Sequence, residues 1–145
     1  GSTRLWEKHP AAMGDAVRRH DDILRGIFTS AGGHIFKTVG DAFCVAFAES
    51  AAALTAAAQA QRALAAAPWG ETGPLLVRIG VHTGSAEFRD SDYFGGTLNR
   101  AARIESAAHG GQVLVSGVTR ALTLDTLPDG FQWRDLGEHR LKGLE

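Results

Sequence analysis

Cysteine is nearly absent from this chain, and so are long apolar runs and an excess of charge of either sign. Cys44 is the single cysteine, which excludes an intramolecular disulfide and makes a reduced, cytoplasmic setting the plain expectation. No run approaches the roughly 20 apolar residues of a membrane-spanning helix, so any membrane attachment is expected outside this segment. The 15 basic and 16 acidic side chains give a net charge of −1, which offers no electrostatic footprint for nucleic acid.

What the chain does contain is typical of one folded domain. Its 145 residues are 44% apolar and 21% charged, so we expect a single domain over residues 1–145. The sequence opens on GSTRLWE with no strand before it and stops at LKGLE just after a strand-like segment. We therefore expect a domain truncated at both ends, without its first and last core strands.

Hydrophobic periodicity and turn residues predict alternating helices and strands. Helices are expected at 9–31, at 50–67 with Ser50 as its cap, within GGTLNRAARIESAAHGG, and from the cap Ser116 to 124. Strands are expected at 34–39, 42–48, 76–82, 85–88, in QVLVS and twice in FQWRDLGEHRLKG. Cys44, in the apolar run FCVAF, is expected to be a small buried residue.

This order of elements predicts an α+β fold. A strand before the first helix would complete a β-α-β-β-α-β unit, which is the ferredoxin-like arrangement of a mixed sheet with helices packed on one face. The fold alone names no function.

Two charged residues stand out in the apolar segment GGHIFKTVGDAFCVAF. Asp41 lies at a glycine-flanked hairpin tip, where it is either an ordinary turn residue or a ligand for a hard cation such as Mg²⁺. Strand alternation places Lys37 on one face with Ile35 and Val39, so its ammonium emerges among apolar neighbours. Lys37 therefore either reaches solvent at a sheet edge or meets a ligand.

Asn99 and Arg103 are four residues apart in a predicted helix and so lie on one face. An amide and a guanidinium placed in this way suit a hydroxyl and a phosphate oxygen of one substrate. The alternative from spacing alone is a solvated helix face.

The combination of FKTVGDAF with DYFGGTLNRAARIES resembles the catalytic domain of class III nucleotidyl cyclases, the adenylate and guanylate cyclase family. GSTRLWE resembles the end of that family's first strand-to-helix motif, and LGEHRLKGLE its closing strands. The resemblance covers nearly the whole chain in order. It implies an enzyme that converts ATP to 3′,5′-cyclic AMP and pyrophosphate.

The resemblance also implies roles for single residues. Asp41 matches the second of two aspartates that hold two Mg²⁺ or Mn²⁺ ions per site, and Lys142 matches a lysine that binds the triphosphate. Lys37 and Asp92 match the two positions that recognise the base, and both favour adenine. Lysine offers only donors, which suit adenine N1, whereas an ionised aspartate accepts from the exocyclic amine.

In the same family, the residues matching Asn99 and Arg103 act in the transition state. Asn99 is expected to orient the ribose, and Arg103 to meet charge on the α-phosphate. Each site of the family forms across a dimer interface. Because this chain matches both halves of the site, the resemblance implies a homodimer with two equivalent sites.

One departure from the family pattern limits the expected activity. The first metal aspartate should precede Gly1, so this segment is expected to be poorly active on its own. The principal alternative is therefore a catalytically inactive cyclase-like module that binds nucleotide or mediates dimerisation and regulation. A ferredoxin-like RNA-binding domain is disfavoured by the balanced charge and by the lack of an aromatic RNP-type strand.

Overall fold

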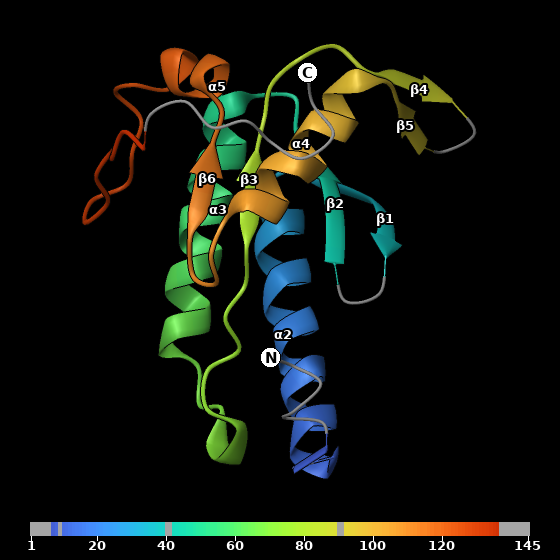
Figure 1. Cartoon of the computed structure of the whole chain (residues 1–145), viewed down its shortest axis with the longest axis vertical. Helices are drawn as coiled ribbons and strands as arrows, with labels where there is room; N and C mark the ends of the chain where they lie inside the picture. The colour runs from blue at the N-terminus through green and yellow to red at the C-terminus, as the bar shows by residue number, and fades with distance from the viewer. Residues whose placement is uncertain (1–6, 9, 40–41, 90–91, 137–145) are drawn as a thin grey trace.

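The structure is a computed structural model that describes residues 7, 8, 10–39, 42–89 and 92–136. Its two longest described helices pack side by side. They are α2 (Pro10–Ser30) and α3 (Ser50–Ala66) (Figure 1). The remaining elements are β1 (His34–Val39), β2 (Ala42–Ala46), η1 (Gly70–Thr72), β3 (Ile79–Val81), β4 (Glu87–Arg89), β5 (Asp92–Phe94), α4 (Gly96–Ala107), β6 (Val113–Val115) and α5 (Gly117–Leu122). No helix in the described ranges is long and apolar enough to cross a membrane.

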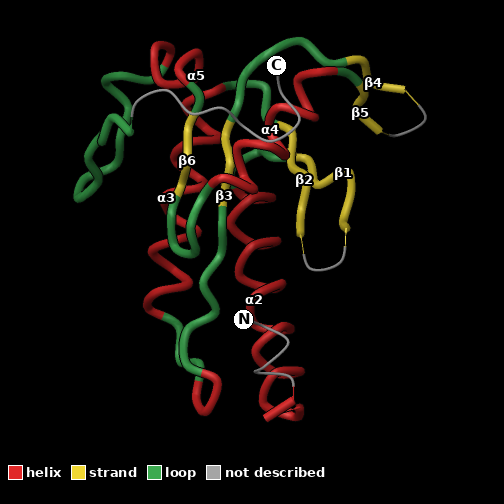
Figure 2. The backbone as a smooth tube through the Cα atoms, viewed as in Figure 1, coloured by secondary structure: helices red, strands yellow, loops and turns green. Residues whose placement is uncertain are grey.

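The strands of the described residues pair two by two (Figure 2). β1 and β2 form an antiparallel hairpin, as do β4 and β5. β3 and β6 are parallel, and α4 lies between them in the chain. This mixture of parallel and antiparallel pairs with helices agrees with the predicted α+β class.

The core lies between the two long helices and the strands. Buried side chains from α2 and α3, together with Trp69, form its centre, and half-buried side chains of β1, β2 and β3 pack against them. Trp69 also donates a hydrogen bond from Nε1 to the Leu64 carbonyl at 2.7 Å. Cys44 is only half-buried, so the expectation of a buried core cysteine was wrong.

The predicted helices and the first hairpin agree closely with the structure, whereas the shorter strands do not. The strand predicted at 76–82 is limited to Ile79–Val81, and the one predicted at 85–88 is found at Glu87–Arg89. β5 was not predicted. It is only three residues long, and its described strand pairing is with β4, which a local sequence pattern does not reveal. Residues 131–136 form no strand, and the rest of the predicted closing strands lies outside the described residues.

Of the two predicted helix caps, one is confirmed. Ser116 caps α5, and its Oγ accepts a hydrogen bond from the Thr119 amide at 3.4 Å. Ser50 is instead the first residue of α3, whose cap position is Glu49, without a side-chain cap. The Ser50 hydroxyl lies 3.0 Å from that of Thr83, so a contact distant in sequence replaces the local cap.

The predicted face of Lys37 was also wrong. β1 pairs with β2 through Ile35 opposite Val45 and then Lys37 opposite Cys44, which leaves Phe36 as an extra residue in a bulge. A bulge interrupts the alternation of strand side chains. Ile35 packs at the core, whereas Lys37 is exposed and carries no burial penalty.

Helix α4 crosses β3 at a position where no side chain fits. A Cβ on Gly80 would lie 2.4 Å from the Glu105 amide nitrogen and 2.7 Å from its Cα. Both are backbone atoms, so the contact could be relieved only by moving the helix or the strand. The glycine therefore fixes how closely α4 approaches the parallel pair.

We predict that Gly80→Ala lowers the free energy of unfolding by about 1–3 kcal/mol, the usual cost of forcing extra atoms into a packed site. Urea denaturation of wild type and variant measures the difference. Gly26→Ala is the matched control, because that glycine lies inside α2 with open space around its Cβ position. The control should gain about 0.5–1 kcal/mol. A Gly80→Ala variant as stable as wild type would contradict the prediction.

Candidate active site

The first turn of α4 is held by the loop that follows β3. Thr97 donates a hydrogen bond from Oγ1 to the Ser85 carbonyl. A Cβ on Gly84 would lie 2.6 Å from the same Thr97 oxygen, so this loop and the helix are in close contact. Loop and strand together thus fix both ends of α4.

Asn99 and Arg103 lie on α4 and are both exposed. Ile104, on another face of the helix, is its buried residue. Among the residues that the structure describes, neither the Asn99 nor the Arg103 side chain makes a hydrogen bond or ion pair. The two groups are one helical turn apart and are accessible to a ligand.

Lys37 and Asp92 belong to strands that are brought together by aromatic side chains. The rings of Phe36 in β1 and Tyr93 in β5 have centroids 4.7 Å apart at an angle of 66°. Phe88 in β4 lies 4.7 Å from Tyr93 on the same measure. The backbone of Asp92, paired with Arg89, therefore lies on the strand that contacts the strand of Lys37.

A chain of hydroxyl groups at the ends of β3 and β6 was missed by the sequence reasoning. Its distances are 3.0 Å from Ser50 to Thr83, 2.7 Å from Thr83 to Thr119 and 3.0 Å from Thr119 to Ser116. Nδ1 of His82 lies 2.8 Å from the Ser116 hydroxyl. The chain anchors the start of the loop that holds α4. Serine and threonine after a strand are too common to have indicated this network.

Burial and a nearby positive charge change the ionisation of His82. Burial disfavours the imidazolium and lowers the pKa of His82 below 6.5, and the positive charge of Arg100 on α4 lowers this pKa further. His82 has a structural role. Its hydrogen bond to Ser116 joins β3 to the cap of α5.

Asp41 and Lys142 lie outside the described residues. Within the described residues, no group of three or more His, Cys, Asp or Glu side chains could hold a metal ion. These residues alone therefore do not fit a metal centre, and the assignment of Asp41 to Mg²⁺ or Mn²⁺ stays a prediction.

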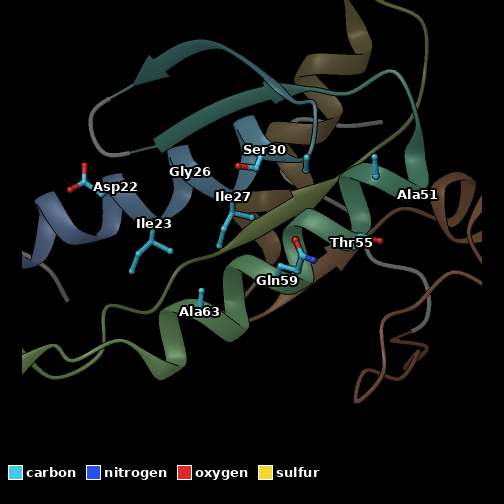
Figure 3. A pocket seen from close by; sticks show the side chains of 11 residues that line it. Asp22, Ile23, Gly26, Ile27, Ser30, Ala51, Thr55, Gln59 and Ala63 are labelled. Carbon is cyan, nitrogen blue, oxygen red and sulfur yellow. The ribbon is translucent and has the colours of Figure 1, made fainter.

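An open groove of about 900 Å³ lies elsewhere, between α2 and α3 (Figure 3). Small and apolar side chains such as Ile23, Ile27 and Ala63 line it. None of the predicted site residues within the described ranges lines this groove. The candidate active site is therefore the exposed region around α4, β1 and β5.

The full chain, residues 1–145, matches the family model of the adenylate and guanylate cyclase catalytic domain. The chain is a member of this cyclase family. Its relatives include an uncharacterized protein of Mycobacterium tuberculosis, which is 38% identical over 145 residues, with 99% of this chain and 48% of the relative covered. The adenylate cyclase of Schizosaccharomyces pombe is 33% identical over 189 residues, with 99% of this chain and 11% of that protein covered. The chain thus spans about half the length of the first of these relatives, and much less of the second.

Solved structures give the same family and confirm the fold. An adenylate/guanylate cyclase/hydrolase from Silicibacter pomeroyi has a TM-score of 0.81 and 30% identity, covering 100% of this chain and 85% of that one. An adenylate cyclase from Trypanosoma brucei in its monomeric state has a TM-score of 0.82 and 29% identity, covering 100% of this chain and 81% of that one. The expected class III cyclase architecture is therefore confirmed, whereas the residue roles remain predictions.

We predict that acidification destabilises this cyclase domain through His82. The folded state holds its pKa below 6.5, so the unfolded state binds the proton more readily as the pH falls below 6.5. Stability should therefore fall with pH until the pH is below the folded pKa, and then level off. Urea denaturation between pH 7.5 and pH 5 measures the slope, which His82→Asn should reduce. An unchanged slope in a folded variant would contradict the prediction.

Proposed function

We propose that this domain is an adenylate cyclase, which converts ATP to 3′,5′-cyclic AMP and pyrophosphate. The observation that carries the proposal is the exposed pair Asn99 and Arg103 on α4, without a partner among the described residues. Because the chain belongs to the cyclase family, we assign this pair to the cyclase reaction. The adenylate cyclases among the relatives and the solved structures favour ATP.

In the proposed reaction, the ribose 3′ oxygen attacks the α-phosphorus and loses its proton. A new bond forms between these two atoms, and the bond to the bridging oxygen breaks, so that pyrophosphate leaves with the bonding electrons. Asn99 orients the ribose by hydrogen bonding, which lines up the attacking oxygen. Arg103 stabilises the charge that grows on the α-phosphate oxygens.

Adenine is selected in this proposal by Lys37 and Asp92. The Lys37 ammonium donates to adenine N1, and the Asp92 carboxylate accepts from the exocyclic amine. Guanine presents a donor at N1 and an acceptor at O6, so both contacts would fail. The contact between β1 and β5 supports the pairing of these residues in one site.

Divalent metal remains part of the proposal through Asp41. Mg²⁺ or Mn²⁺ would neutralise the triphosphate when bound, and a carboxylate is the ligand that these ions prefer. Lys142 is the proposed triphosphate lysine. Activity is best sought in the complete protein, because this chain spans about half the length of its Mycobacterium tuberculosis relative.

We predict that Asn99→Ala and Arg103→Ala each lower kcat with ATP by about 10²–10³-fold, because each removes a group that acts in the transition state. Cyclic nucleotide formation from ATP and from GTP is measured with Mg²⁺ and with Mn²⁺. Arg18→Ala is the control, since it removes the same charge from an exposed position on α2 instead of α4 and should retain activity. A dimeric wild type that forms no cyclic nucleotide would sink the proposed activity and favour the inactive module.

If the two sites are shared across a homodimer, two inactive variants should complement each other. Asp41→Ala and Asn99→Ala should each be inactive as homodimers, because each loses one half of both sites. Mixing the two variants should restore about one quarter of wild-type activity, because heterodimers form half of a random mixture and keep one intact site. Mixing two Asn99→Ala preparations is the control. A dimeric mixture without recovered activity would count against shared sites.

A further inference from the structure

The two proposed base-reading residues each adjoin one ring of a single aromatic contact. Phe36 immediately precedes Lys37 in β1, and Tyr93 immediately follows Asp92 in β5. The two rings meet at 4.7 Å and 66°, an edge-to-face geometry that aromatic pairs favour. The rings thus stand beside both ends of the site that would hold the base.

The bulge in β1 takes Phe36 out of the regular pairing with β2. The pairing with β2 passes from Ile35 directly to Lys37, so Phe36 has no partner residue across the hairpin. A bulge re-aims a side chain, and this one contacts another hairpin. The same bulge shifts Lys37 out of the alternation that would have placed it with Ile35.

β5 is a short strand that contacts both β1 and α4. Within the described part of the chain it pairs only with β4, over three residues. An isolated two-stranded hairpin is only marginally stable in water. The rings of His34, Phe36, Phe88 and Tyr93 are among the contacts that join this hairpin to β1, and Figure 1 shows β4 and β5 at one end of the molecule, next to α4.

We infer that the Phe36–Tyr93 contact is a specificity-determining spacer, which sets the separation of Lys37 and Asp92 and thereby the preference for adenine over guanine. The inference rests on the proposed function and deepens it. Phe36 and Tyr93 are positioning residues in this view, because they act through their chain neighbours. A contact that merely stabilised the fold would leave base selection unchanged.

The test compares Tyr93→Leu with two matched variants in the complete protein. Tyr93→Leu should raise the KM for ATP and reduce the ATP-over-GTP preference by about 5- to 10-fold, the order expected for loss of an aromatic contact. Its kcat at saturating ATP should change much less. Tyr93→Phe keeps the ring and should behave as wild type.

Phe94→Leu is the second control. Phe94 lies on β5 like Tyr93 and is 38% exposed, but its ring packs against Arg89 of the same hairpin. It should leave the KM and the base preference within about twofold of wild type. A double-mutant cycle of Phe36→Leu and Tyr93→Leu should be non-additive, with the double variant no worse than the more affected single variant.

Binding gives a readout that does not require turnover. Thermal shifts with ATP and with GTP report base preference directly, and Tyr93→Met keeps apolar volume without a rigid ring if Tyr93→Leu fails to fold. A folded Tyr93→Leu or Tyr93→Met variant with unchanged base preference would overturn the inference, as would a fall in kcat alone. A wild type that prefers ATP in binding but forms no product would overturn the proposed activity and leave the spacer testable.

Discussion

The geometry of the candidate site depends on the close approach of β3 and α4 at Gly80, which is possible because glycine has no Cβ. The backbone of β3 contacts the backbone of α4 at Glu105. This contact fixes the distance between the helix and the parallel strand pair. Thr97 then contacts the loop at Ser85, which fixes the first turn. Asn99 and Arg103 are therefore placed by backbone packing rather than by bonds of their own. Groups held in this way meet a substrate without first breaking other interactions.

A second and separate constraint places the residues proposed to read the base. It consists of ring contacts between β1 and the β4–β5 hairpin, with no part of β3 involved. The two constraints meet where β5 leads through Gly95 into α4. The proposed base recognition and the proposed transition-state stabilisation thus depend on different interactions in one continuous segment. A change in the rings can alter specificity while the helix stays in place.

The sequence was informative where structure is local. The long helices follow from periodic apolar residues, the first hairpin from its Gly40-Asp41 tip, and the Ser116 cap from its position before α5. Local patterns failed where distant contacts decide. Ser50 bonds to Thr83 instead of capping α3, and the Phe36 bulge moves Lys37 off its expected face. Spacing paired Asn99 with Arg103, but the roles of all site residues came from family resemblance and not from any local signal.

Because the chain has a net charge near zero, the positive charges on α4 matter for attracting an anionic ligand. A nearly neutral protein attracts a triphosphate only through local groups, and α4 carries Arg100 and Arg103 in neighbouring turns. Arg100 already acts on its surroundings, since it contributes to the lowered pKa of His82. The field that disfavours an imidazolium there favours an anion. Burial is already the larger cause of the low pKa of His82, and an anionic nucleotide bound beside Arg100 would offset the second cause. Acid sensitivity and ligand binding are therefore linked through one guanidinium.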